Sequence, residues 1–253
     1  MNHKPSSEKQ IIRVPDAQSV AEYGYRILCE YGSEAIEKRG YFTMAISGGS
    51  TPVLFFRQIA EESQSNGIDW NKVHIFWVDE RAVPPDDEAS NYRLAAEGFL
   101  NQICIPPGNI YRMPGELDDL GQAAKTYEQT LQRVFGLSGK EFPEFDLIVL
   151  GMGSDGHIAS LMPGSYALIN KENLVTTVFR MEKDFSRLTL TVPVLLAARQ
   201  LMVLVSGDSK ADIVKAVLTS APDAVKYPAH LLWPVLDKVL WVLDESAARK
   251  LQG

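Results

Sequence analysis

The spacing of apolar residues along the chain switches repeatedly between short continuous runs and positions three or four apart. From Asp16 to Gly40 the apolar residues recur at helical spacing, which predicts a helix that Asp16 caps and Gly40 ends. An apolar run at 41–46 follows directly and predicts a buried strand. Because strand and helix continue to alternate, we expect a mostly parallel sheet covered by helices on both faces.

The other predicted elements follow the same order. Further strands are predicted at 73–78, 110–111, 145–150, 174–179, 188–191, 201–206 and 238–243. Further helices are predicted at 52–60, 91–101, 117–135, 209–218 and 244–251. No repeat or low-complexity linker divides the sequence. We therefore expect one domain over 16–253, preceded by a flexible segment at 1–15.

Composition narrows the class of protein. The 253 residues are 45% hydrophobic and 23% charged, as in ordinary globular proteins, and no apolar run is long enough to span a bilayer. The net charge of -7 argues against nucleic acid as a partner, and the polar N-terminus lacks a signal-peptide core. We expect a cytoplasmic protein with no membrane partner. Cys29 and Cys104 lack metal-ligand spacing, and we interpret both as buried, inert thiols.

The stretch from Phe145 to Gly164 carries the clearest chemical signal. A buried strand leads into a loop with three glycines, in which Asp155 and His157 stand two residues apart. Open α/β sheets bind ligands at the carboxyl ends of their strands, so we interpret His157 as a functional base. The glycines also match a dinucleotide-binding pattern, but Pro163 would end the helix that a pyrophosphate needs.

A second loop follows the strand predicted at 41–46. Its glycines free the backbone to curl, and the helix start behind it supplies unpaired N–H groups, so the loop predicts a phosphate cradle. It lacks the Gly-Lys-Ser/Thr of a nucleotide-binding P-loop, and a tight, capped strand-to-helix turn is the alternative. The residues of this loop are Ser47, Gly48, Gly49, Ser50 and Thr51.

Charged side chains lie at the ends of other strands. If the chain stays extended after 78, Asp79 and Arg81 point to one side and Glu80 to the other. Lys210 falls in the first turn of a helix, from which its ammonium group can reach a phosphate, and Arg187 could supply a second cation. Alone, the pair of Asp79 and Arg81 could equally be a surface ion pair. Arg187 or Lys210 alone would more often be a solvated surface charge. Together they favour a site for an anionic, hydroxylated ligand.

These motifs, in this order, resemble the 6-phosphogluconolactonases of the glucosamine-6-phosphate isomerase superfamily. The resemblance runs from about Asp16 to the C-terminus. It implies a Rossmann-like three-layer α/β/α sandwich and hydrolysis of 6-phospho-D-glucono-1,5-lactone to 6-phospho-D-gluconate in the oxidative pentose phosphate pathway. It implies no metal and no organic cofactor. The motifs that carry it are Ser47–Pro52, Asp79-Glu80-Arg81 with Ser90-Asn91-Tyr92, and Gly151–Leu161.

The resemblance also implies roles for single residues. His157 would be the general base that deprotonates the attacking water, with Asp155 shaping its surroundings. The phosphate would be held by the loop from Ser47 to Thr51, with Arg187 and Lys210.

Arg81 would be a further ligand for substrate oxygens or phosphate. Three questions stay open: whether Asp79 contacts substrate or orients Arg81, which groups stabilise the oxyanion, and whether the chain is a monomer or a small homo-oligomer.

The sister activity of the superfamily, deamination of glucosamine 6-phosphate, is the main alternative. Deaminases place a glutamate five residues after the histidine and a tyrosine after the Asp-Glu pair. This chain has Met162 and Arg81 at those positions, and both departures favour the lactonase. A catalytically silent sugar-phosphate sensor would keep the cradle and lose the base, but His157 is present.

Overall fold

A computed structural model describes residues 9–63, 68–179 and 185–251. Its centre is a seven-stranded sheet in the order β1-β10-β9-β6-β2-β3-β5, and every pairing in it is parallel. Four of its inner strands, β2, β6, β9 and β10, are buried along their whole length, as the continuous apolar runs predict. The strands are β1 Gln10–Val14, β2 Phe42–Ile46, β3 Val73–Trp77, β5 Ile110–Tyr111, β6 Leu147–Leu150, β9 Leu201–Val205 and β10 Val239–Asp244.

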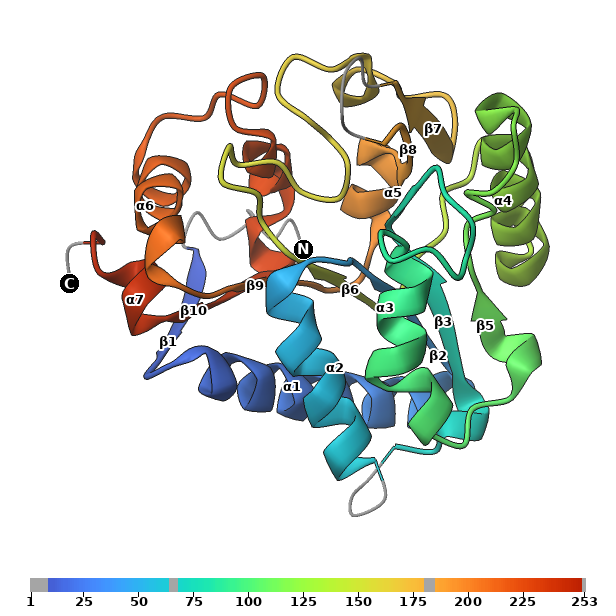
Figure 1. Cartoon of the computed structure of the whole chain (residues 1–253), viewed down its shortest axis with the longest axis horizontal. Coiled ribbons are helices and arrows are strands. Elements are labelled where there is room, and N and C mark those ends of the chain that lie inside the picture. The colour runs from blue at the N-terminus through green and yellow to red at the C-terminus, as the bar shows by residue number, and fades with distance from the viewer. Residues whose placement is uncertain (1–8, 64–67, 180–184, 252–253) are drawn as a thin grey trace, which may run out of the picture.

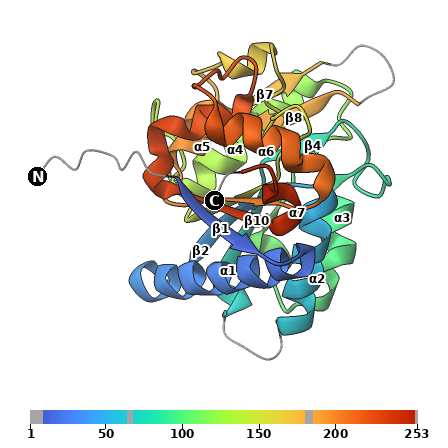
Figure 2. The ribbon, with the colours of Figure 1, turned by 90° about the vertical axis from the view of Figure 1, so that its left-hand side faces the viewer.

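Helices cover both faces of this sheet and make the three layers. Figure 1 shows α1, α2 and α3 below the sheet and α4, α5 and α6 above it, and Figure 2 shows the same layers from the side. No helix in the described ranges is long and apolar enough to cross a bilayer. The helices are α1 Ala17–Arg39, α2 Ser50–Glu62, α3 Asn91–Gly98, α4 Leu120–Phe135, α5 Val192–Ala197, α6 Ala211–Thr219 and α7 Glu245–Ala248.

The ends of α1 illustrate how local sequence sets these boundaries. The Asp16 carboxylate accepts a hydrogen bond from the Ser19 backbone N–H at 2.8 Å, which satisfies one of the unpaired donors of the first turn. Gly40 ends the helix with a φ of 85°, a left-handed conformation that glycine adopts without strain. The predicted cap and stop of this helix are both confirmed.

A second, smaller sheet lies over the carboxyl ends of the central strands. It contains β4 (Asp79–Arg81), β8 (Arg187–Leu190) and β7 (Val175–Val178), and both of its pairings are antiparallel. The sequence predicts the strands near β7 and β8. It does not predict β4, because three charged residues carry no apolar signal for a strand.

Two expectations are wrong. The segment Gln10–Val14 is not flexible but forms the edge strand β1, which pairs with β10. An edge strand has one neighbour and keeps polar residues exposed, so its pattern resembles that of a tail. Residues 1–8 lie outside the described part of the chain. Cys104 is exposed rather than buried, and Cys29 is only partly buried, although that burial raises the pKa of its thiol.

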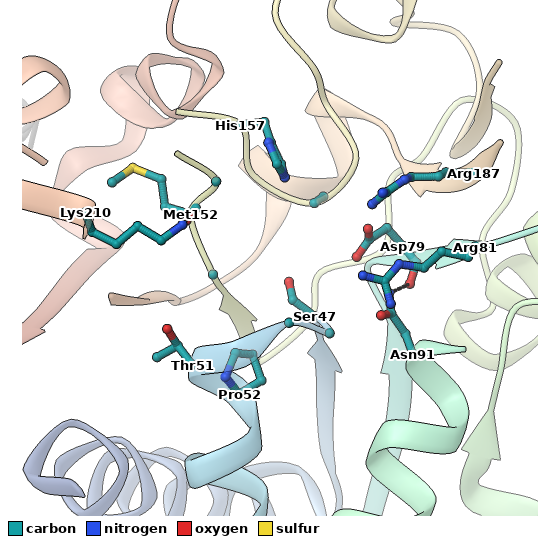
Figure 3. Close-up of a pocket in the computed structure, with 15 residues that line it drawn as sticks. Ser47, Thr51, Pro52, Asp79, Arg81, Asn91, Met152, His157, Arg187 and Lys210 are labelled. Carbon is teal, nitrogen blue, oxygen red and sulfur yellow. Dashed lines mark hydrogen bonds between the residues drawn. The ribbon is translucent and has the colours of Figure 1, made fainter. Parts of the chain in front are cut away.

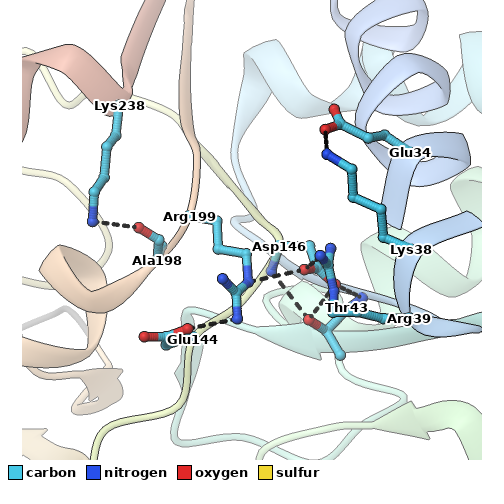
Figure 4. Close-up of polar contacts among 9 residues, drawn as sticks. All are labelled: Glu34, Lys38, Arg39, Thr43, Glu144, Asp146, Ala198, Arg199 and Lys238. Atoms are coloured by element: carbon cyan, nitrogen blue, oxygen red, sulfur yellow. Dashed lines mark hydrogen bonds and ion pairs between the residues drawn. The ribbon is translucent and has the colours of Figure 1, made fainter. Parts of the chain in front are cut away.

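A buried carboxylate, that of Asp146, ties together the amino-terminal ends of β2 and β6. It is 5% exposed and accepts hydrogen bonds from the Thr43 backbone N–H at 2.9 Å and from the Thr43 hydroxyl at 3.0 Å. Arg39 donates to it at 2.6 Å, and Arg199 lies 3.4 Å away (Figure 4). A buried charge is tolerated only when it is paired in this way, so Asp146 connects the starts of β2 and β6 to the end of α1 and to the loop before β9.

We expect Asp146→Asn to lower the free energy of unfolding by about 1.5 kcal/mol, because the amide still accepts from Thr43 but loses the ion pairs with half-exposed arginines. Urea denaturation measures this loss. Glu34→Gln is the matched control, since the exposed Glu34–Lys38 pair should contribute about 0.5 kcal/mol or less. Equal losses in the two variants would contradict a structural role for Asp146.

Candidate active site

A pocket opens at the carboxyl ends of β2 and β6 (Figure 3). The chain leaves β2 toward β3 on one side, whereas β6 and β9 extend the sheet on the other, so the pocket lies where the strand order reverses. Open α/β sheets bind their ligands in this crevice. Its lining residues are Ser47, Gly48, Gly49, Thr51, Pro52, Asp79, Arg81, Asn91, Gly151, Met152, Gly153, His157, Ala159, Arg187 and Lys210.

The His157 side chain points into this pocket (Figure 3), and the Asp155 carboxylate contacts the ring nitrogen Nδ1. The Asp155 carboxylate lies 2.6 Å from His157 Nδ1 and also accepts from the His157 backbone N–H at 3.1 Å. Partial burial raises the pKa of Asp155. The charge of His157 and its hydrogen bonds lower that pKa by more than burial raises it, so the pKa lies below its ordinary value. An ionised Asp155 accepts the Nδ1–H, which leaves Nε2 as a proton acceptor. Asp155 itself does not line the pocket.

The glycines around His157 are required by close approach and by backbone conformation. A Cβ atom on Gly153 would collide with the His157 ring, and the Gly153 N–H donates to the His157 carbonyl at 2.8 Å. Gly156 has a φ of 82°, which L side chains rarely adopt. The loop therefore closes on itself and fixes the imidazole, rather than opening into a dinucleotide-binding helix.

The loop after β2 forms one wall of the pocket. Gly49 has a φ of 114° and leads directly into α2, whose first-turn N–H groups have no partner within the helix. The Thr51 hydroxyl lies 3.3 Å from that of Ser206. Ser50 is the first residue of α2, but its side chain lies outside the described part of the structure. These free N–H groups are suited to bind an anion.

Cations stand on two sides of the pocket. Lys210 donates to the Met152 carbonyl at 2.7 Å, and burial lowers its pKa although the charge of Asp155 opposes this. On the other side, Arg81 and Arg187 face each other directly across the antiparallel pair of β4 and β8 (Figure 3). Two cations in register across two strands concentrate positive charge on this side of the pocket, which is suited to an anion.

The segment of β4 confirms the predicted alternation of side chains. Asp79 and Arg81 both line the pocket, whereas Glu80 turns away and is 2% exposed. Glu80 accepts hydrogen bonds from the backbone N–H groups of Asn91 at 2.7 Å and Tyr92 at 2.8 Å. Burial raises the pKa of Glu80, although these hydrogen bonds oppose the shift. Glu80 thus fastens the start of α3 to β4.

Asp79 also contacts the histidine loop. Its carboxylate accepts a hydrogen bond from the Ser160 hydroxyl at 2.6 Å, and the Ser160 backbone N–H donates to the Thr189 hydroxyl at 3.2 Å. The Arg81 guanidinium does not share this partner. It donates to the Ala89 carbonyl at 2.7 Å. Asp79 therefore links β4 to the segment that follows His157, which is a contact that sequence reasoning did not anticipate.

Asn91 is a pocket residue that sequence reasoning missed. It belongs to the Ser90-Asn91-Tyr92 motif, but the sequence favours helix capping for polar residues at this position. The Ser90 hydroxyl does accept from the Arg93 N–H at 3.2 Å, as a cap should. The signal that could have found Asn91 is that a capping serine already stands before it, so a second amide or hydroxyl is not needed for the cap.

Comparison with known proteins completes the description of the site. The family model for glucosamine-6-phosphate isomerases and 6-phosphogluconolactonase matches residues 15–241. A 6-phosphogluconolactonase from Synechocystis is 39% identical over 87% of this chain and 89% of its own length. A 6-phosphogluconolactonase structure from Trypanosoma brucei has a TM-score of 0.84 at 26% identity, covering 97% of this chain and 99% of that one. A monomeric glucosamine-6-phosphate deaminase shares the fold, with a TM-score of 0.81 at 21% identity over 95% and 99% of the two chains.

Proposed function

We propose that this chain, which belongs to the glucosamine-6-phosphate isomerase and 6-phosphogluconolactonase family, hydrolyses 6-phospho-D-glucono-1,5-lactone to 6-phospho-D-gluconate. It is a carboxylic ester hydrolase of the oxidative pentose phosphate pathway. The observation that carries the proposal is the arrangement of the pocket. A histidine oriented by a carboxylate faces a site with cations on two sides and helix N–H groups on a third.

In the proposed reaction His157 is the general base. Its Nε2 atom takes a proton from a water molecule while the water oxygen attacks the lactone carbonyl carbon. The bond from that carbon to the ring oxygen then breaks. The ring oxygen takes the proton from His157 Nε2 and becomes the hydroxyl of the open-chain acid, which restores the neutral base. A six-membered lactone is already an activated ester, so a serine nucleophile is not required. Asp155 keeps the imidazole in the correct tautomer throughout.

The cations and the loop after β2 would bind and orient the substrate. Arg81 and Arg187 would share one anion, and Lys210 with the Ser47–Thr51 loop would donate from the other side; their register across β4 and β8 and their place in the pocket lining support this. Fixing the phosphate places the carbonyl carbon for attack, which is the main contribution that a binding site can add to an activated ester. Asp79, tied to Ser160, would hold the β4 side of the pocket against the histidine loop.

One paired assay tests this proposal. Acid release is followed from freshly prepared 6-phosphogluconolactone, with spontaneous hydrolysis subtracted, beside ammonia release from glucosamine 6-phosphate. We expect turnover of the lactone only. Ammonia release at a comparable rate would assign the chain to the deaminases instead.

Met162 provides a prediction about the boundary between the two activities. Its side chain is 8% exposed and does not line the pocket. We expect Met162→Glu to release no ammonia from glucosamine 6-phosphate, because a carboxylate buried there has a raised pKa and lacks neighbours that would align it with a sugar ring. Met162→Gln is the neutral control in the same assay. Clear ammonia release by the glutamate variant alone would show a site already organised for isomerase chemistry.

A further inference from the structure

Two of the side chains that line the pocket each carry a buried polar atom without a hydrogen-bond partner. The two atoms are Ser47 Oγ and Asn91 Oδ1, in side chains that are 5% and 1% exposed. Buried polar groups in folded proteins almost always have a partner, because leaving one unpaired after its removal from water is costly. Two such atoms, on side chains that line the same pocket, indicate that a ligand supplies the missing hydrogen-bond partners.

The orientation of the Asn91 side chain is fixed by its other contacts. Its Nδ2 group donates to the Asp79 backbone carbonyl at 2.9 Å. Reversing the amide would put Oδ1 against that carbonyl oxygen, and two acceptors repel each other. Its own backbone N–H is held by Glu80 at 2.7 Å. The Oδ1 atom lies where a Cβ of residue 48 would stand, and only a glycine there leaves room for it. The oxygen is therefore held beside Gly48, in the loop after β2 that lines the same pocket.

An amide oxygen can only accept a hydrogen bond. Phosphate oxygens at neutral pH are acceptors as well, so Asn91 Oδ1 does not pair with the phosphate. The donors that a sugar lactone offers are its ring hydroxyl groups. The Ser47 hydroxyl can donate or accept, so it can also pair with a hydroxyl group of the substrate.

We infer that Asn91 is a specificity-determining residue, whose Oδ1 atom accepts a hydrogen bond from one ring hydroxyl of the lactone beside Ser47. This inference rests on the proposed function. It adds that the pocket recognises a ring hydroxyl group of the substrate as well as its phosphate. A site built to bond a hydroxyl rejects an analogue that lacks it, because its own polar groups are then left unpaired. Asn91 thus selects a hydroxylated ring over a deoxygenated one.

A mutant cycle against substrate analogues tests this inference. Values of kcat/KM are measured for 6-phosphogluconolactone and for its 2-deoxy, 3-deoxy and 4-deoxy forms, with wild type and with Asn91→Ala. We expect wild type to prefer the parent lactone over one deoxy form by about tenfold or more, and Asn91→Ala to lose that preference at the same position only. A merely structural role would lower kcat/KM equally for all four lactones.

Ser90→Ala is the matched control. It removes the neighbouring helix cap and the hydrogen bond to Glu80 at 3.1 Å, but Ser90 does not line the pocket. This control should lower stability and leave the preference among lactones unchanged.

Wild type alone also decides the matter if Asn91→Ala fails to fold. Hydrolysis of all three deoxy lactones within about twofold of the parent would overturn the inference and mean that water pairs with Oδ1. Failure of wild type to hydrolyse the parent lactone would overturn the proposed function instead, so the two failures are distinguishable.

Discussion

Replacing His157 by alanine should lower kcat/KM for 6-phosphogluconolactone by about 10²-fold or more, the range over which general bases contribute. The imidazole is the proton acceptor that Asp155 orients toward the pocket, and no other histidine within residues 9–63, 68–179 and 185–251 lines the pocket. The phosphate ligands are separate side chains, so binding of the product 6-phosphogluconate should change little. Rates after subtraction of spontaneous hydrolysis give the first quantity, and calorimetry gives the second.

His74→Ala is the control for the loss of a histidine. His74 lies in β3 and contacts the Tyr111 hydroxyl at 3.1 Å, away from the pocket. It should keep full activity. Retention of more than about a tenth of wild-type activity by His157→Ala would rule out the general-base role.

The second large effect is expected from the cations. Lys210→Ala and Arg187→Ala should each weaken kcat/KM for the phosphorylated lactone by about 10- to 100-fold, since a hydrogen bond to a charged group is worth about 1.5–3 kcal/mol. For unphosphorylated gluconolactone, kcat/KM of each variant should equal that of wild type, because this substrate has no phosphate that the removed side chain could bind. The measurement is the ratio of kcat/KM for the two lactones in each variant.

Lys215→Ala is the matched control for charge. Lys215 is exposed on α6 and outside the pocket, so its removal changes the net charge as Lys210→Ala does without touching the substrate. Its ratio should equal that of wild type. Equal losses toward both lactones in Lys210→Ala or Arg187→Ala would mean that the cation supports the fold of the pocket and does not read the phosphate.

The sequence by itself determined most of the helices and strands, although not β1 or β4, and the contacts that depend on neighbouring residues. Apolar runs marked the buried strands of the central sheet, because a parallel strand is covered on both faces. The contact of Asp155 with His157 and the shared direction of Asp79 and Arg81 follow from spacing alone. Residues two apart on an extended or tightly turned chain have few ways to be placed.

Only the tertiary structure decided the contacts between distant segments. The register that sets Arg81 opposite Arg187, the hydrogen bond of Ser160 to Asp79, and the position of Asn91 each join segments far apart in the chain. Strand register depends on how whole faces pack, and a shift of one residue would turn every side chain to the other face. The unpaired oxygen of Asn91 exists because α3, β4 and the loop after β2 meet at one point, which no local pattern encodes.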